Sequence, residues 1–133
     1  MKLFFLFLVA SCFSILNFSA QEKIWLNAKE AIVAKENASF YRVFVIKNNK
    51  KQLATDYLIS GEKARTYHFR NNKKEGLFFS FYPSGEVKVA GIYKDGLKDG
   101  VFKTYHKNGK IKQKGKYSKG EKVGVWKIFY KNE

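Results

Sequence analysis

Glycine recurs at a fixed spacing of 24 residues through the C-terminal half of the chain. The nine glycines after residue 75 fall on only four positions of this period, and Gly61 falls on the same lattice. Aromatic residues keep the same spacing. The equivalent sets are Phe78, Phe102 and Trp126; Phe81, Tyr105 and Phe129; and Phe69, Tyr93 and Tyr117. A period of this length indicates an array of repeats, each stacked on the next.

The residues between the glycines are typical of β-hairpins. Short runs rich in Phe, Tyr, Val and Ile, such as 77–82 and 101–106, alternate with turns that include Asp95-Gly96 and Asn108-Gly109. These dipeptides supply the positive φ that tight hairpin turns need. The spacing between glycines leaves no room for a helix of useful length. The sequence therefore predicts an all-β fold, an elongated antiparallel meander of stacked hairpins.

The repeats divide the chain into a lead-in segment and an array. Residues 21–51 form the lead-in, with a short helix over 28–36 capped by Asn27 and a strand over 40–46. The array spans residues 52–133, as a degenerate repeat (52–75), two clear repeats (76–99 and 100–123) and a truncated one (124–133). Strands are also predicted over 53–58 and 64–69 in the first half of the chain, with turns at 47–51 and 71–74. One proline and no Ser/Gly-rich run indicate one continuous sheet without a linker.

Lysines alternate with other residues in the predicted strand 110–117, and period two places them on one face. The candidate binding lysines are Lys88, Lys110, Lys112, Lys114 and Lys116. In one interpretation this basic ladder attracts an anionic surface such as lipid headgroups, acidic polysaccharide, nucleic acid or an acidic protein. In the other, the lysines keep a narrow sheet soluble and its edges unpaired.

The aromatic set Phe78, Phe102 and Trp126 also has two interpretations. The rings either fill the core between successive hairpins or form an exposed track for a peptide or glycan. Trp126 lies in the last predicted strand, where no following repeat covers it, so the C-terminal edge is a candidate partner site. The mid-strand glycines Gly91 and Gly115 mark either bulges or a close approach of an aromatic neighbour. We favour the close approach, because an aromatic residue follows each glycine by two positions.

Residues 1–20 have the pattern of a cleaved signal peptide. Lys2 precedes an apolar run that is too short to span a bilayer, and a polar chain begins at Gln21. We expect cleavage between Ala20 and Gln21, with export to the periplasm or the extracellular space. Two alternatives are a lipoprotein anchored through Cys12 and a buried N-terminal helix.

The segment from Gly100 to Trp126 resembles the bacterial MORN-repeat variant, a family that includes antitoxin-like proteins of the YwqK type. The matching residues are Gly100, Phe102, Asn108, Gly109, Gly115, Tyr117, Gly120, Gly124 and Trp126. The resemblance covers about residues 52–133, and residues 36–42 resemble the segment that precedes such repeats in secreted Bacteroidetes proteins. It implies a β-hairpin array in the cell envelope.

Residues for catalysis are few. His68 and His106 lie in different repeats, whereas Asp95 and Asp99 lie beside turn glycines. The glycines are periodic and not clustered before a helix, as a phosphate loop requires. A single Cys excludes a disulfide framework and a Cys-based zinc site. We therefore expect no enzyme activity, no cofactor and no metal.

We expect an exported protein-interaction or scaffold module of the cell envelope, acting through the open sheet face or the C-terminal edge. The alternative is an electrostatic binder of anionic lipid or polysaccharide, which the net charge of +15 favours. Export argues against nucleic acid. A third possibility, an antitoxin or immunity-like partner, is implied by the resemblance alone.

Overall fold

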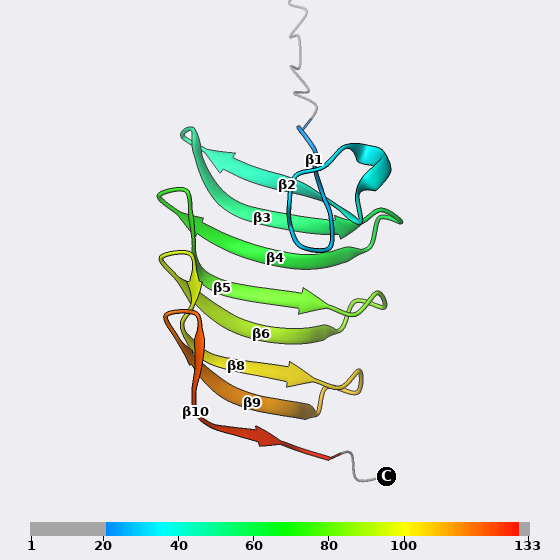
Figure 1. Cartoon of the computed structure of the whole chain (residues 1–133). Coiled ribbons are helices and arrows are strands. Elements are labelled where there is room, and N and C mark those ends of the chain that lie inside the picture. Colours follow the sequence, from blue (N-terminus) through cyan, green and yellow to red (C-terminus); the bar gives the residue numbers. More distant parts are fainter. Residues whose placement is uncertain (1–20, 131–133) are drawn as a thin grey trace, which may run out of the picture.

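The computed structural model describes residues 21–130, which form one antiparallel sheet of ten strands (Figure 1). The strands follow the order of the sequence, except that the two-residue strand β7 pairs with β6 beside the main path. Their bounds are β1 (Ile24–Leu26), β2 (Phe40–Lys47), β3 (Lys50–Leu58), β4 (Lys63–Arg70), β5 (Lys73–Phe81), β6 (Val87–Lys94), β7 (Leu97–Lys98), β8 (Gly100–Tyr105), β9 (Ile111–Ser118) and β10 (Glu121–Ile128). The predicted all-β antiparallel meander is confirmed. The predicted signal peptide, with Cys12 and Ala20, lies outside the described residues.

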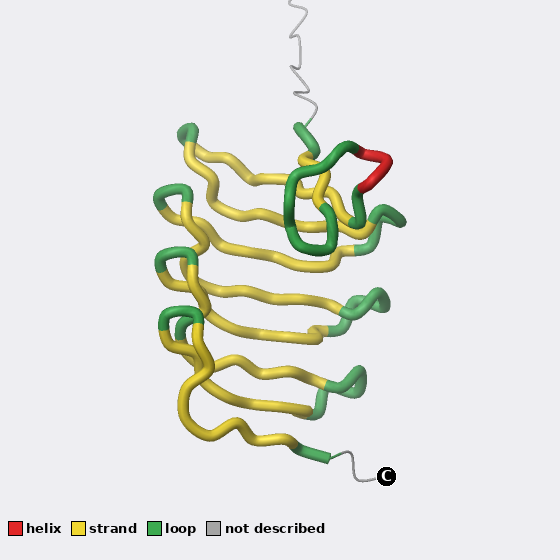
Figure 2. The backbone as a smooth tube through the Cα atoms, viewed as in Figure 1, coloured by secondary structure: helices red, strands yellow, loops and turns green. Residues whose placement is uncertain are grey.

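The turns explain why the chain folds back at regular intervals. At one end of the hairpins, two consecutive residues adopt positive φ, as type I′ turns require. These pairs are Asn48-Asn49, Asn71-Asn72, Asp95-Gly96 and Lys119-Gly120. At the opposite end, Gly61, Gly85 and Gly109 have φ of 85–105° in loops that share one hydrogen-bond pattern (Figure 2). The degenerate repeat thus has the same loop as the two clear repeats.

The predicted helix over 28–36 is wrong. The side chain of Asn27 does accept backbone N–H groups, from Lys29 at 2.9 Å and Ala31 at 3.0 Å, but it closes a tight loop instead of starting a helix. Glu30 has a φ of 61°, and Ile32 forms an isolated bridge back to Leu26. The only helical piece among the described residues is the single 3-10 turn η1 (Lys35–Asn37). A short segment gains little from helical hydrogen bonds, so tertiary contacts decide its shape.

The core lies on one side of this single-layer sheet, which we call the inner face. It is the side that carries the buried side chains of Ala54, Tyr67, Phe78 and Phe102. The aromatic rings contact one another from strand to strand, with centroids 4.9 Å apart for Tyr67–Phe78 and for Phe102–Tyr117. The opposite side, the outer face, carries half-exposed aliphatic side chains. The sheet therefore builds its core from its own rings, without a second layer.

Gly91 and Gly115 allow this ring packing. A Cβ atom at Gly91 would overlap the ring of Phe102, and one at Gly115 would overlap the indole of Trp126. The predicted close approach of an aromatic neighbour is confirmed. The ring, however, comes from the adjacent strand and not from the aromatic residue two positions later. That residue points to the same face but lies about 7 Å away along the strand, whereas a directly opposite cross-strand neighbour is only about 5 Å away.

In the degenerate repeat (52–75), the small and the large residue of the equivalent cross-strand pair exchange places. Phe78 pairs with Gly91 across β5 and β6, and Phe102 pairs with Gly115 across β8 and β9. At the equivalent position of β3 and β4, the small residue comes first, in the pair Ala54–Tyr67. The phenol group of the degenerate repeat therefore projects from a different strand than the rings of the clear repeats.

Candidate binding surfaces

The loop after β1 folds over the inner face, in front of β2, β3 and β4 (Figure 1). It carries Glu30, whose carboxylate lies 3.1 Å from Arg42 Nη2, 3.3 Å from Arg65 Nη1 and 3.1 Å from Lys74 Nζ. The hydroxyl of Tyr67 also donates a hydrogen bond to it, at 2.9 Å. Four donors from three strands thus hold one side chain of the loop, which we call the lead-in loop (residues 27–33).

A second carboxylate lies beneath this contact. Asp56 is fully buried, and its oxygens lie 2.8 Å from Arg42 Nη2 and 3.0 Å from Arg65 Nη2. The two arginines therefore bridge a buried carboxylate in the sheet and a half-buried one in the loop. A buried charge is tolerated only where opposite charges and hydrogen bonds satisfy it, as they do here.

The electrostatics of this cluster keep Glu30 ionised. Burial by itself raises the pKa of the Glu30 carboxyl, but the charge and hydrogen bond of Lys74, with smaller effects of Arg65 and Tyr67, lower that pKa to about 2. Burial lowers the pKa of the Lys74 ammonium, and Glu30 offsets this only in part. Burial also raises the pKa of the Tyr67 phenol, so that this hydroxyl remains a donor at neutral pH. The lead-in loop is thus held by charge.

Lysines line the inner face at the same 24-residue spacing as the glycines. Lys74, Lys98 and Lys122 pair across the strands with Phe69, Tyr93 and Tyr117, respectively. Each ammonium lies over aromatic rings, within the range of cation–π attraction. The Nζ–centroid distances are 3.8 Å to Tyr67 and 5.4 Å to Tyr93 for Lys74, 4.9 Å to Tyr117 and 5.4 Å to Phe102 for Lys98, and 4.5 Å to Trp126 for Lys122.

The outer face carries the predicted lysine ladder. Lys88, Lys112, Lys114 and Lys116 lie on it, exposed, whereas Lys110 lies in the turn before β9 and not in the strand. Lys114 pairs directly with Lys103 of β8 on one side and with Lys127 of β10 on the other. Beside this row lie the exposed aliphatic side chains of Leu77, Ile92 and Val101. The result is a cationic row next to an apolar strip.

Sequence reasoning missed several of these residues. Lys103 and Lys127 share the period-two parity of their strands, but only the cross-strand register aligns them with Lys114. The shared spacing of the inner-face lysines could have been found from the sequence, because the 24-residue period that identified the glycines also relates Lys74, Lys98 and Lys122. The cluster around Glu30 and Asp56 has no periodic signal, since it joins residues from the non-repetitive part of the chain.

The candidate aromatic set is placed on the inner face. Phe78 and Phe102 are buried in the core, and Trp126 is half-buried with its ring centroid 5.2 Å from that of Tyr117. The three rings follow one another across the sheet, as the core-packing interpretation requires. Trp126 is the member of this set that a ligand on the inner face would contact.

The two histidines are not brought together. His68 is exposed, with Nδ1 3.0 Å from the carbonyl oxygen of Leu77, and it lines a hollow of about 800 Å³ near the ends of the strands. His106 lies in the turn between β8 and β9, outside that hollow. Residues 21–130 contain no cluster of three or more His, Cys, Asp or Glu side chains placed to hold a metal ion. None of the helical structure described there is long and apolar enough to cross a bilayer.

Comparison with protein families assigns the repeating hairpins. Residues 74–95 and 98–119 each match the family model described as the MORN repeat variant. Two MORN repeats are present in this chain. The first begins at Lys74 and the second at Lys98, so each MORN repeat opens with an inner-face lysine. MORN repeats are commonly protein- or membrane-binding modules, and comparison with curated proteins gives no match.

Proposed function

We propose that this chain is a non-enzymatic protein-interaction module that holds a segment of a partner on the inner face of its MORN repeats. One observation supports this proposal above all. The chain already binds a polypeptide segment on this face, because its own lead-in loop lies over β2–β4 and is held there through Glu30. The same face continues over β6–β10, beyond the lead-in loop.

The continuation offers side chains suited to a peptide. Tyr93, Tyr117 and Trp126 are half-buried, so each exposes part of a ring. The row that holds Arg42, Asp56 and Arg65 on β2–β4 is continued by Val89, Thr104 and Gln113 on β6, β8 and β9. The ion-paired row of the covered half thus becomes an uncharged row in the open half. Aromatic rings with nearby hydroxyl and amide groups are typical of protein-binding surfaces.

Site-specific photo-crosslinking tests this proposal. A photoreactive amino acid at Gln113 faces the inner side, whereas the same amino acid at the neighbouring Lys112 faces the outer side. We expect a discrete protein adduct in the producing cell from position 113 and none from position 112. The absence of adducts from position 113, or equal adducts from both positions, contradicts an inner-face partner.

A second candidate function rests on the outer face. The row formed by Lys103, Lys114 and Lys127 lies beside exposed aliphatic side chains, which together suit an anionic lipid surface or an acidic polysaccharide. Each lysine near an anionic membrane contributes about 1 kcal/mol. If this candidate is right, the chain binds phosphatidylglycerol vesicles at low salt and is released by about 0.3 M salt. Replacing the three lysines by Gln abolishes binding, whereas replacing Lys29, Lys47 and Lys63 does not.

We further propose that the module works after export, in the cell envelope. The support is the signal-peptide pattern of residues 1–20, with expected cleavage between Ala20 and Gln21. N-terminal sequencing of the protein from the envelope tests this directly. A first residue of Gln21 supports plain secretion, and a lipidated Cys12 supports the lipoprotein alternative. The antitoxin-like role stays a prediction from the resemblance.

A further inference from the structure

The three inner-face lysines occupy equivalent positions in successive hairpins. Besides their shared spacing and aromatic partners, Lys74 and Lys98 have the same backbone contact. The carbonyl oxygen of Lys74 accepts the N–H of Gly96 at 2.9 Å, and that of Lys98 accepts the N–H of Gly120 at 2.8 Å. The positions therefore agree in backbone geometry as well as in side-chain environment.

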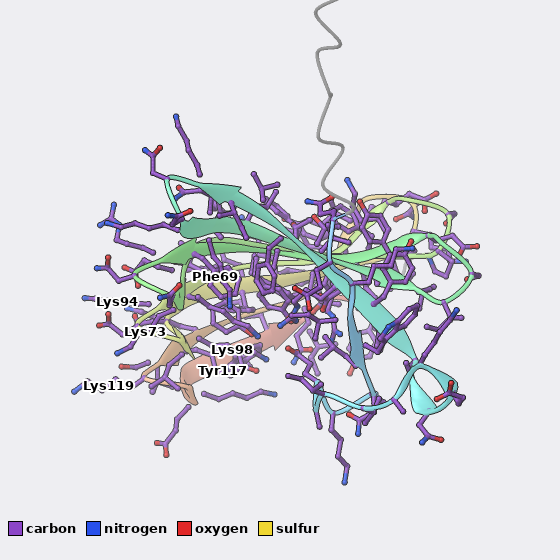
Figure 3. All side chains as sticks on the ribbon, turned by 90° about the horizontal axis from the view of Figure 1, so that it is seen from above. Phe69, Lys73, Lys94, Lys98, Tyr117 and Lys119 are labelled. Carbon is purple, nitrogen blue, oxygen red and sulfur yellow. The ribbon has the colours of Figure 1, made fainter. Side chains whose placement is uncertain are left out.

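The equivalent positions differ in their charge partners. Lys74 pairs with Glu30 of the lead-in loop at 3.1 Å. All ion pairs among residues 21–130 involve Glu30 or Asp56, so within this part of the chain Lys98 and Lys122 have no carboxylate partner. Lys98 is half-buried over two rings, and Figure 3 shows it beside Tyr117 on the side of the sheet that faces the lead-in loop.

We infer that Lys98, with Lys122, forms a docking site for carboxylates of an acidic peptide, equivalent to the site that Glu30 occupies at Lys74. The inference rests on the proposed function and names the chemistry of the partner. The chain itself provides the precedent, because a glutamate carried by a peptide loop fills the first of the three equivalent positions. The rings of Phe102 and Tyr117 hold the Lys98 ammonium in place by cation–π attraction, and this unpaired ammonium supplies the charge that a carboxylate requires.

The repeat geometry also sets the spacing of the carboxylates. Neighbouring strands lie about 4.8 Å apart, so equivalent positions one hairpin apart are separated by about 10 Å. A segment in the polyproline II conformation advances about 3.1 Å per residue and completes one turn in three residues, so acidic residues three positions apart point to the same side and lie about 9 Å apart. The partner segment would run across the strands, as the lead-in loop does over β2–β4 (Figure 1). Such a peptide carries Glu or Asp at every third position.

Two synthetic peptides of equal charge test this inference on the purified chain. One is dye-labelled Glu-Thr-Ser-Glu-Thr-Ser-Glu, and the other has the same composition with its three glutamates adjacent. We expect the spaced peptide to bind about tenfold more tightly, since each additional charge-assisted contact is worth about that factor. Lys98→Gln removes the preference, Lys98→Arg keeps it, and the control Lys112→Gln on the outer face leaves it unchanged. Thermal unfolding verifies that each variant is folded.

The outcomes separate this inference from the proposed function. If both peptides bind equally, or if Lys98→Gln and Lys112→Gln weaken binding alike, only the overall positive charge attracts them and the carboxylate site is wrong. The carboxylate site is then wrong even if position 113 still crosslinks to a protein. In that case the proposed function holds, and the partner is recognised through groups other than carboxylates. If anionic vesicles compete with the spaced peptide for wild type but not for Lys98→Gln, the site recognises lipid headgroups, which overturns the peptide assignment.

Discussion

The indole ring of Trp126 lies against the backbone of Gly115, in the space that a side chain at position 115 would need. The same relationship joins Phe102 to Gly91 one hairpin earlier. Each glycine belongs to a mid-strand position that adopts ordinary extended backbone, so the requirement for glycine is one of space and not of φ. The two pairs set the distance at which aromatic rings stack along the inner face.

Gly115→Ala therefore destabilises the sheet. The added methyl group must displace the indole, and overpacking of this kind costs about 1–3 kcal/mol. Urea denaturation followed by tryptophan fluorescence measures the loss. In the Trp126→Ala background the same change has little effect, because the ring is absent. Lys116→Ala, one residue away on the outer face, is the control, and an equal loss in that variant contradicts the packing argument.

Acid weakens the contact between the lead-in loop and the sheet. Because the folded-state pKa of Glu30 is lowered from 4.5 to about 2, its stabilising effect is complete above pH 4.5 and is lost as the pH falls toward 2. Glu30→Gln removes this part of the pH dependence of the free energy of unfolding. The exposed residue Glu36, replaced by Gln, serves as the control. If wild type and Glu30→Gln lose stability in parallel between those pH values, the assignment to Glu30 is wrong.

Removal of the buried carboxylate costs more. Asp56→Ala leaves the guanidinium groups of Arg42 and Arg65 without their buried partner, and breaking a buried ion pair costs about 3–5 kcal/mol. We expect a lower thermal unfolding temperature and faster proteolysis of the lead-in loop. Glu121→Ala removes an exposed carboxylate from the same sheet and is expected to change the stability by less than about 0.5 kcal/mol. Comparable losses in both variants refute the special role of the cluster.

One turn can be improved. Lys119 has a φ of 48° at the position that Asn48, Asn71 and Asp95 occupy in the other type I′ turns. This backbone conformation is less favourable in free energy for lysine than for asparagine, so Lys119→Asn is expected to stabilise the protein by about 0.5–1 kcal/mol. Lys110→Asn removes the same charge at a turn position without positive φ. Calorimetry measures the stability of both variants. If Lys110→Asn stabilises the protein as much as Lys119→Asn, the effect is due to the lost charge and not to the backbone conformation.

The aligned lysines of the outer face repel one another. Lys114 lies between Lys103 and Lys127, and like charges directly opposite each other destabilise a sheet. Lys114→Glu converts both contacts into attractive ones and is expected to raise the free energy of unfolding by about 0.5–1 kcal/mol at low salt. In about 1 M salt the gain disappears. Lys112→Glu, outside the row, controls for net charge, and an equal gain there contradicts the pairwise explanation.

Much of this fold follows from the spacing of residues along the sequence. Gly91 and Gly115 revealed both the repeat and the ring packing, since small residues at a fixed period record a geometric need. The helix predicted over 28–36 failed because Asn27 is an equally good partner for a loop, and the deciding contact of Glu30 comes from residues up to 44 positions away. Local patterns carry no information about such distant partners.

The candidate surfaces were predictable to different degrees. Strand parity correctly assigned Lys112, Lys114 and Lys116 to one face, but it placed Lys110 in a strand where the chain still turns. The alignment of Lys103 with Lys114 depends on register, which the turns fix only once their type is known. Lys98 was overlooked because its importance becomes visible only by comparison with Lys74, whose partner lies in the irregular part of the chain.

The exchange of sizes at Ala54 and Tyr67, together with the ionic contacts of Asp56, gives a sheet of near-identical hairpins a defined starting point. Chains built from similar units risk joining strands one unit out of step. If β3 paired with β6 in place of β4, Asp56 would face Val89 instead of Arg65, and Ala54 would face Gly91 and leave a void. An unpaired buried charge and an empty space both oppose that arrangement. The irregular hairpin thereby protects the regular ones against misassembly.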